Sequence, residues 1–377
     1  MLRLSIVRIS TLLNLDDPYN RRVLPGAVEF ARLKDWQLTI HNVKRVDDIT
    51  SAMKDADGLL LGIHNFEEEP ALSRTPIPAV CWSGSLVDIN WRRVTNDDFA
   101  IGQVAAEHLI DRGFRHFVFY NDSPDIWAIR RHDGFLGRLE LDDLTAITLT
   151  KPKSDRNTEL VEQLLAVPRP FGAMMAHDPS AIRFMAACRE AGLRIPDDVA
   201  VLSVNNDDFV CDVCNPPLSS IPLQTHRIGY ESAALLAKLL EKVPLAPWSI
   251  VIPPSEMVVR RSSDTLATSD PLVIEAIGFI REELASGIAT KQVVKAMAVS
   301  RTTLDARFMQ AVGRTVADEI RRERLERARH LLASTDLPMP DIALRCGFSS
   351  ARQLGETFTH FVQQTPSAYR RFVQHKS

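Results

Sequence analysis

Two side chains one helical turn apart, Trp127 and Arg131, have the chemistry needed to hold a sugar. Residues four apart on a helix share one face, so both can point into the same cleft. A guanidinium donates hydrogen bonds to hydroxyl groups, and an indole ring packs against the apolar C–H face of a pyranose. The pair is therefore a candidate sugar contact, with a surface position for Arg131 and a core position for Trp127 as the alternatives.

Further polar residues follow segments that have the composition of β-strands. Asp178 comes shortly after the apolar run Phe171–Ala176, and Asn205 directly follows Val199–Val204. Asp17 and Tyr19 follow the first apolar run of the chain. Ligands of open α/β sheets bind beyond the carboxyl ends of the strands, so these four residues are candidate ligand contacts. Asp17 and Tyr19 could instead form a turn before the first helix, because Asp-Pro is a common turn pair.

The first 250 residues alternate short β-rich runs with amphipathic helical patterns. The expected strands are Leu4–Ile9, Gln37–Asn42, Gly58–Ile63, Ala79–Trp82, His116–Tyr120, Phe171–Ala176 and Val199–Val204. Such alternation predicts parallel sheets covered by helices on both faces, and this length suffices for two sheets. Arg8 interrupts the first apolar run and no small-residue cleavage site follows, so we expect a strand there and no secretory signal.

Composition and charge distinguish the C-terminal part of the chain from the rest. Of 377 residues, 45% are hydrophobic and 25% are charged, which is typical of a globular protein. Residues 271–377 contain 16 Lys and Arg against 11 Asp and Glu, whereas the remainder has a net charge of −8. A basic C-terminal part favours contact with a polyanion there, with a chance distribution of charge as the alternative. Five cysteines, an odd number, fit the reducing cytoplasm, and no apolar run is long enough to span a membrane.

The C-terminal part has the pattern of two helix-turn-helix units. Residues 290–297 and 340–346 predict short helices, each followed by a tight turn and a serine-capped second helix, with Ser300 and Ser349 as the caps. The second helix of such a unit can enter the major groove of DNA. The expected base-contacting residues are Arg301, Thr302 and Asp305 in one unit and Ser350, Arg352, Gln353 and Glu356 in the other. Thr315–Ala333 predicts a connecting helix of about 28 Å, which approaches the repeat of B-DNA.

The last 100 or so residues resemble the AraC-type regulator domain. The resemblance lies in residues 331–350, in Phe358-x-x-Phe361 and in Thr365-Pro-Ser-Ala-Tyr369. It implies a DNA-binding transcription regulator. Ala298 departs from the glycine that such domains often have in the first turn, and a positive φ there would cost about 1 kcal/mol.

Residues 94–135 and 171–240 resemble the LacI/GalR-type effector domain, which is similar to periplasmic sugar-binding proteins. The matching segments include Val94-Thr-Asn-Asp97, Arg131-His-Asp-Gly-Phe135, Met175-Ala-His-Asp178 and Pro217–Gln224. The resemblance implies a two-lobed fold with crossovers near Asn96, Ile221 and Leu245. It places Arg131, Asp178 and Asn205 at sugar-contacting positions, although Asp is more common where Asn205 stands.

An effector domain of this type ahead of an AraC-type domain resembles the arrangement of the xylose operon regulators. We expect a two-lobed effector domain over residues 1–265 and a DNA-binding domain over 271–377, joined by a docked linker. The resemblance implies a cytoplasmic homodimer that binds double-stranded DNA and a monosaccharide, D-xylose first. It further implies an activator of sugar-catabolic genes that would contact RNA polymerase.

Other classes of protein have weaker support in the sequence. A phosphate loop, a metalloprotease motif, a nucleophile elbow and a dinucleotide-binding motif are all missing from the sequence, so we expect no enzyme and no cofactor. Cys211 and Cys214 form a single CxxC without a second pair, so we expect no metal site. The alternatives are a sugar-binding protein or a carbohydrate-processing enzyme without a transcriptional role.

Overall fold

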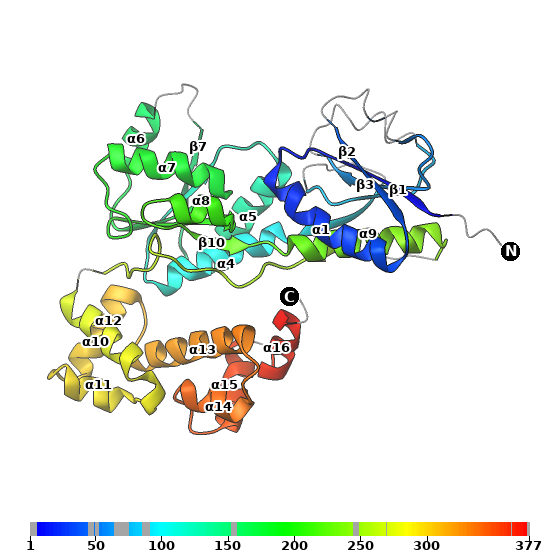
Figure 1. The fold of residues 1–377 in the computed structure, drawn as a ribbon. Helices are drawn as coiled ribbons and strands as arrows, with labels where there is room; N and C mark the ends of the chain where they lie inside the picture. The colour runs from blue at the N-terminus through cyan, green and yellow to red at the C-terminus, as the bar shows by residue number, and fades with distance from the viewer. Residues whose placement is uncertain are drawn as a thin grey trace.

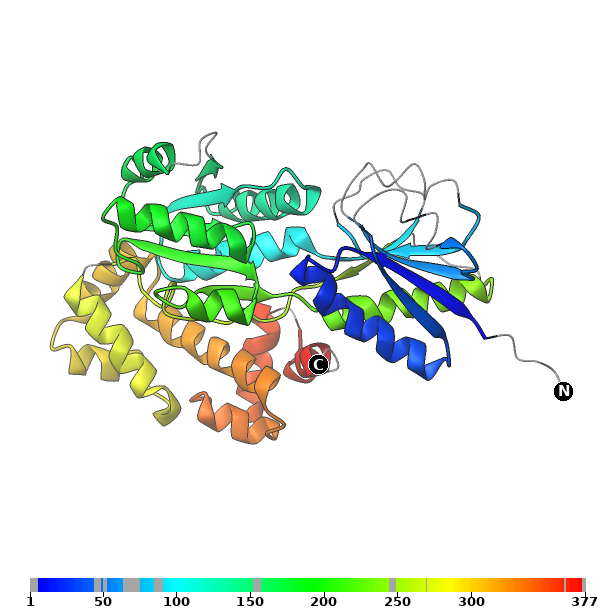
Figure 2. The ribbon, with the colours of Figure 1, turned by 45° about the horizontal axis from the view of Figure 1, so that its top comes forward.

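The computed structural model describes residues 6–43, 49, 53–63, 75–84, 91–151, 157–243, 249–268, 270–362 and 364–374. Two α/β lobes lie side by side, and a helical domain lies below them (Figure 1). After rotation of the view, the helical domain is seen to lie against the lobe that contains α4 (Figure 2).

Lobe 1 is built on a six-stranded sheet in the order β11-β5-β4-β3-β1-β2, with every pair parallel. Its elements are β1 (Arg8–Leu13), α1 (Pro18–Leu33), β2 (Gln37–Asn42), β3 (Gly58–Gly62), β4 (Ala79–Cys81), β5 (Arg92–Asn96), α9 (Thr225–Leu240) and β11 (Ser249–Ile252). Apolar residues of α1 and α9, such as Val23 and Leu236, pack on one face of this sheet. The two helices touch backbone to backbone, because a Cβ on Gly26 would lie 1.8 Å from the carbonyl oxygen of His226.

Lobe 2 is built on a five-stranded parallel sheet in the order β10-β9-β8-β6-β7. Its elements are α4 (Asp98–Asp111), β6 (His116–Asn121), α5 (Ile126–Glu140), β7 (Ala146–Thr150), α6 (Thr158–Leu165), β8 (Phe171–Met175), α7 (Asp178–Glu190), β9 (Val199–Asn205), α8 (Asp208–Val213) and β10 (Ser219–Pro222). One hydrophobic cluster joins the sheet to α4 and α5, and another joins it to α6 and α7. Helices therefore cover both faces, as the alternating pattern predicted.

The chain crosses between the lobes at three places. The first lies between β5 and α4, next to Asn96, and the second lies between β10 and α9, just after Ile221. The third follows β11, because Val258 pairs with Ser220 of lobe 2. The third crossover was therefore placed too early by the sequence, near Leu245, which itself lies outside the described residues. The strand β11 returns to the edge of the lobe 1 sheet before the chain leaves.

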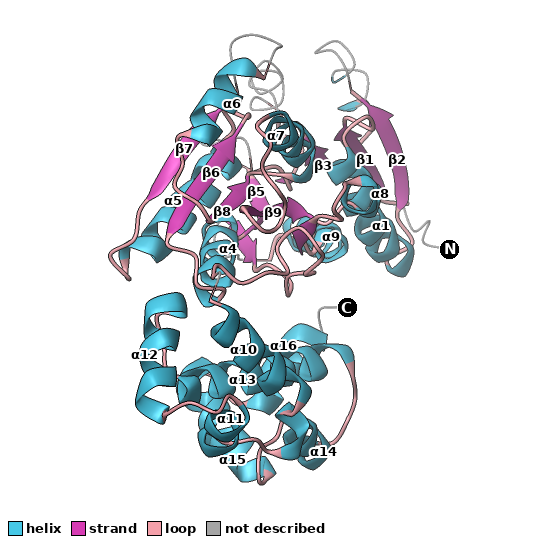
Figure 3. Cartoon of the chain, turned by 90° about the vertical axis from the view of Figure 1, so that its left-hand side faces the viewer, coloured by secondary structure: helices cyan, strands magenta, loops and turns pink. Residues whose placement is uncertain are grey.

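From Pro271 onward, the described part of the chain is helical (Figure 3). Its elements are α10 (Pro271–Glu282), η1 (Leu284–Ser286), α11 (Thr290–Ala296), α12 (Arg301–Val312), α13 (Val316–Ser334), α14 (Met339–Arg345), α15 (Ala351–Val362) and α16 (Pro366–Gln374). Helices α11 and α12 form one helix-turn-helix unit, and α14 and α15 form the other. Ser300 caps α12 as expected, since its hydroxyl accepts from the Thr303 N–H. The second cap is one residue later than predicted, at Ser350, whose hydroxyl accepts from the Gln353 N–H at 3.2 Å.

The first strand was also misplaced by the sequence. In the described residues it runs from Arg8 to Leu13, beyond the predicted end at Ile9, and the small hydroxyl residues Ser10 and Thr11 are buried inside it. The predicted start at Leu4 lies outside the described residues. The remaining strand predictions are correct to within one residue. Four strands were missed, namely β5, β7, β10 and β11, all of which are short and either polar or at the edge of a sheet.

Candidate effector site and DNA-binding surface

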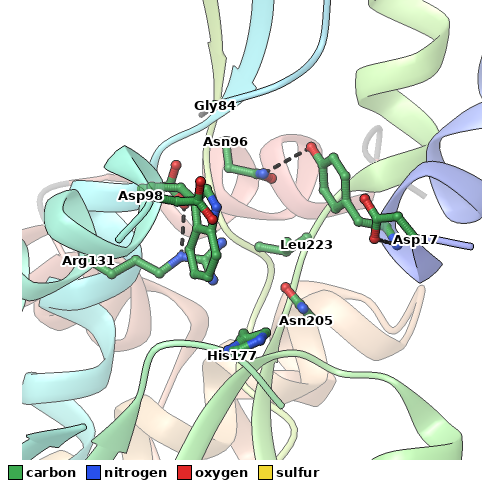
Figure 4. Close-up of a pocket in the computed structure, with 11 residues that line it drawn as sticks. Asp17, Gly84, Asn96, Asp98, Arg131, His177, Asn205 and Leu223 are labelled. Atoms are coloured by element: carbon green, nitrogen blue, oxygen red, sulfur yellow. Dashed lines mark hydrogen bonds and ion pairs between the residues drawn. The ribbon is translucent and has the colours of Figure 1, made fainter. Parts of the chain in front are cut away.

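A cavity of about 200 Å³ lies where the two lobes meet (Figure 4). Its lining residues are Asp17, Tyr19, Gly84, Asn96, Asp98, Asp125, Trp127, Arg131, His177, Asn205 and Leu223. They come from the segments that follow the strands of both sheets, where ligands of parallel α/β folds bind. The volume is several times the roughly 30 Å³ that one water molecule occupies in the liquid, so a small polar molecule fits.

Five of the six residues predicted to contact a ligand line this cavity. They are Asp17, Tyr19, Trp127, Arg131 and Asn205. The sixth, Asp178, is fully buried beside it, and its carboxylate accepts from Ser220 Oγ and from the Asp207 N–H, both at 2.7 Å. Burial raises the pKa of Asp178. Its contacts hold β10 and the loop after β9, so in this conformation Asp178 positions its neighbours.

Arg131 is buried, with only 3% of its surface exposed, so it is not a surface helix residue. Its Nε donates to Asp98 Oδ1 at 2.9 Å, and its Nη1 donates to the Ala176 carbonyl at 2.7 Å. Its guanidinium also lies 4.7 Å from the centre of the Trp127 ring. Burial raises the pKa of Asp98, and the charge of Arg131 opposes that rise. The guanidinium is thus held in one orientation at the cavity wall.

Lobe 1 contributes Asp17 and Tyr19 at the start of α1. The Asp17 carboxylate caps this helix by accepting from the Tyr19 N–H at 2.9 Å. The Tyr19 hydroxyl accepts from Asn96 Nδ2 at 3.1 Å, which ties lobe 1 to the first crossover. Burial raises the pKa of Tyr19, so its phenol stays protonated and its O–H remains a donor.

Asn205 lies across the cavity at the end of β9. Its φ of 109° is in the positive region that non-glycine residues rarely adopt. Its carbonyl oxygen accepts from Arg22 Nη1 of α1 at 2.8 Å, a second link between the lobes. This strained backbone is held by the contact with the opposite lobe, which is typical of a binding site.

Six further lining residues were not predicted, namely Gly84, Asn96, Asp98, Asp125, His177 and Leu223. His177 stands edge-on to Trp127, with ring centres 5.4 Å apart, and burial lowers its pKa and favours a neutral ring. Its position two residues after the end of β8 could have revealed it. The role of Asp98 could not be inferred, because its partner Arg131 is on another helix.

The predicted DNA-contacting residues lie at the starts of α12 and α15. Arg301, Thr302, Ser350, Arg352, Gln353 and Glu356 are exposed. Arg352 and Glu356 form an exposed ion pair at 2.8 Å, as do Arg301 and the partly buried Asp305 at 3.4 Å. Asp305 also accepts from the Val316 N–H at 3.0 Å and so holds the start of α13. Gln353 Oε1 accepts from the Ser349 N–H at 2.8 Å, which orders the turn before α15.

Comparison with known families identifies both parts of the chain. Residues 106–263 match the periplasmic binding protein-like domain, and residues 293–371 match a helix-turn-helix domain. The chain is thus a DNA-binding, sugar-responsive transcription regulator in which an effector domain of periplasmic-binding-protein type precedes an AraC-type domain. In the described ranges, no helix is long and apolar enough to cross a membrane.

The chain is similar over nearly its whole length to xylose operon regulatory proteins. It is 28% identical to that of Escherichia coli strain K12, over 96% of each chain. It is 26% identical to that of Haemophilus influenzae, over 96% of this chain and 98% of the relative. The solved structure of a xylose-binding transcription activator matches with a TM-score of 0.61 and 27% identity, over 97% of this chain and 98% of that one. These relatives are transcription regulators and not enzymes.

Proposed function

We propose that a monosaccharide, D-xylose first, binds in the cavity between the lobes and controls the binding of the chain to DNA. The observation that supports this most is that Asp17 and Tyr19 of lobe 1 and Trp127, Arg131 and Asn205 of lobe 2 line one small cavity. A ligand touched by both lobes has different affinities for their open and closed arrangements, and only such a difference can shift the equilibrium.

The residue types suit a sugar. Carboxylates and amides exchange hydrogen bonds with hydroxyl groups, and the indole of Trp127 offers an apolar face to the ring carbons. The choice of xylose rests on the names of the similar proteins, which are described as xylose operon regulators and as a xylose-binding activator. Asp178 remains a proposed contact only in an arrangement where the loop after β9 has moved.

For DNA, the proposal assigns base contacts to the exposed starts of α12 and α15. The assigned residues are Arg301, Thr302, Asp305, Ser350, Arg352, Gln353 and Glu356. Arginine binds guanine edges through two hydrogen bonds, and carboxylates accept from cytosine. The helix α13 has 19 residues, hence a length of about 28 Å, which suits two adjacent major grooves.

We divide the chain into an effector domain over residues 1–265 and a DNA-binding domain over 271–377. We further propose a cytoplasmic homodimer that covers four major-groove segments and activates sugar-catabolic genes through RNA polymerase. Light scattering with sugar and DNA present should give, at micromolar concentration, a mass equal to two protomers plus the bound DNA. A mass of one protomer plus the bound DNA under those conditions would refute the dimer.

The sugar is tested by calorimetric titration of the full chain with xylose, arabinose, ribose, glucose and galactose. We expect the strongest binding with xylose. Arg131→Ala should weaken it about 10- to 100-fold, because hydrogen bonds to a charged group are worth roughly 1.5–3 kcal/mol. Arg130→Ala is the matched control, since Arg130 is the exposed neighbour on the same helix. Binding of another sugar only would replace xylose, and binding of none would refute the effector site.

A further inference from the structure

Helix α4 belongs both to the candidate effector cavity and to the contact with the helical domain. Its first residue, Asp98, lines the cavity and pairs with Arg131. At its last residue, the carbonyl oxygen of Asp111 accepts a hydrogen bond from the Arg314 guanidinium. Fourteen residues at 1.5 Å each give a helix of about 21 Å. A single helix thus extends from the cavity to the helical domain. Figure 3 shows α4 on the side of the effector domain that faces the helical domain.

Helix α4 is held tightly to α5, the helix that contains Trp127 and Arg131. A Cβ on Gly102 would lie 2.1 Å from the Arg131 carbonyl oxygen, and one on Gly134 would lie 2.0 Å from the Phe99 carbonyl oxygen. The two backbones are therefore in direct contact, and close-packed elements transmit a displacement instead of absorbing it. A ligand that moves Trp127 or Arg131 relative to lobe 1 must move α4 as well.

The linker was expected to be docked from Arg261 to Asp270, and its described residues 261–268 lie on the end of α4. Ser262 and Ser263 are fully buried. Arg112 Nε donates to the Ser263 carbonyl at 3.0 Å, and the Arg112 carbonyl accepts from the Ala267 N–H at 2.9 Å. Arg112 Nη1 also lies 2.9 Å from His108 Nδ1, so the ring must be neutral and can donate from Nε2 to Ser263 Oγ. Burial likewise lowers the pKa of His108 well below its usual value.

Beyond the linker, the same connection continues into the first helix-turn-helix unit. Asp270 caps α10 through the Leu272 N–H at 3.0 Å and pairs with Arg307 of α12, where Nε and Oδ2 are 2.7 Å apart. Arg314 follows α12 and pairs with Glu319, which is fully buried on α13. Burial opposes ionisation of Glu319, but Arg322 and Arg314 hold its pKa below the usual range. Arg314 thus joins the end of α4 to the helix that connects both units.

A neighbouring cleft of about 370 Å³ leaves room for the contact between α4 and the helical domain to change. It lies between α4, the third crossover at residues 253–257, and the helical-domain residues Arg329, Val362 and Tyr369. The crossover is one of the segments that change when two lobes close, so the cleft should change its width with the state of the effector cavity.

We propose that α4 transmits the state of the effector cavity to the first helix-turn-helix unit, and that Arg314 is the residue that couples them. This inference rests on the proposed function for its ligand. When α4 moves relative to lobe 1, the Asp111 carbonyl and the docked linker move with it. The helices α12 and α13, which are attached to them, are then reoriented relative to lobe 1. The coupling free energy is the same in both directions, so DNA must change the affinity for sugar by the factor by which sugar changes the affinity for DNA.

The test measures this coupling factor in the full-length chain. The dissociation constant for operator DNA is measured with and without saturating xylose, and that for xylose with and without DNA. In the parent protein, we expect a factor in the usual range of about 5 to 150. Arg314→Ala should reduce the factor to within about twofold of 1, while the affinity for xylose without DNA stays within about twofold of the parent.

Two further variants keep the result interpretable. Arg281→Ala is the matched control, because Arg281 pairs with Glu323 in the same region of α13, where their atoms are 3.1 Å apart, and it should leave the factor unchanged. Arg112→Ala removes side-chain contacts between the end of α4 and the linker, and it should also reduce the coupling factor. It provides this test even if Arg314→Ala does not fold. Parent-like factors in both Arg112→Ala and Arg314→Ala would overturn the proposal. A parent protein that binds xylose and DNA independently would overturn it too, whereas a parent that binds no sugar refutes the proposed function itself.

Discussion

The two helix-turn-helix units share one design but differ in their turns and in what they touch. The first unit has Ala298 in its turn, exposed and with a φ of 52°, whereas the second has Gly347, buried and with a φ of 74°. A Cβ on Gly347 would lie 2.0 Å from the Leu284 carbonyl oxygen. The same backbone conformation thus accepts a side chain in one unit and excludes it in the other, because Ala298 is exposed whereas the second turn packs against another backbone.

The units also differ in how they are attached to the rest of the chain. The first contacts lobe 2, since Val312 lies against Gly113 and Arg314 donates to the Asp111 carbonyl. The second packs within the helical domain, with Arg324 of α13 over the Phe348 ring and donating to the Ile288 carbonyl, and it faces lobe 2 across the cleft that Val362 lines. We therefore expect the first unit to be coupled more strongly to the effector cavity than the second.

The largest effect is expected from Gly347→Ala. The substitution adds a methyl group against a carbonyl oxygen and forces a non-glycine residue into the left-handed region. These costs are roughly 1–3 kcal/mol for overpacking and 1–2 kcal/mol for the backbone, about 3 kcal/mol together. Calorimetric unfolding should show a lower transition temperature for the helical domain.

Gly355→Ala is the control for that experiment. It lies within α15 of the same unit, and an added Cβ there has nothing within 4 Å. The substitution should stabilise the helix by about 0.5–1 kcal/mol. Equal stability of the two alanine variants would contradict the close approach at Gly347.

Arg301→Ala and Arg352→Ala are expected to have the next largest effects, on DNA binding. Arg352 has 88% of its side chain exposed and Arg301 has 70%, and each is tied to its own helix by an exposed ion pair of little energy. Each substitution should cost roughly 1–3 kcal/mol of binding, concentrated at one base position. A gel shift with a panel of single-base operator variants measures this.

The same assay compares the two units. We expect the effect of Arg301→Ala to depend more strongly on xylose than that of Arg352→Ala. A uniform loss over all operator variants would make the arginine a phosphate contact. Equal dependence on xylose in both variants would remove the distinction between a strongly and a weakly coupled unit.

Local patterns were sufficient to predict most of this architecture. The strand β2 was predicted with its observed bounds, and the helix α13 was predicted to within one residue, because both have a composition typical of their type. The rest depends on tertiary contacts. The strand β11 is four residues long and is fixed by its pairing with β5, which the sequence does not show.

Part of the cavity lining was likewise predictable from local patterns. The rest of the lining depends on tertiary contacts that the sequence does not show. Residues after the ends of strands could be selected by rule, and three of those four, Asp17, Tyr19 and Asn205, line the cavity. The helical spacing of Trp127 and Arg131 gave the other two lining residues. Asp178 obeys the rule of strand ends, but its carboxylate is directed at Ser220 and Asp207 in the folded chain. Conversely, Asp98 acquires its place only through the contact between α4 and α5, which depends on Gly102 and Gly134.

The smallest effect, and the sharpest test of the difference between the turns, is Ala298→Gly. Glycine relieves the left-handed backbone, which costs an ordinary residue roughly 1–2 kcal/mol. It also makes the unfolded chain more flexible, which offsets about 0.5–1 kcal/mol of that gain. The net stabilisation should therefore be about 0.5 kcal/mol, with DNA affinity unchanged, because the turn already has the conformation that glycine prefers. Ala306→Gly, at an exposed position inside α12, should instead destabilise by about 1 kcal/mol. If both variants destabilise equally in calorimetric unfolding, Ala298 is unstrained and the two turns do not differ in the way their φ angles indicate.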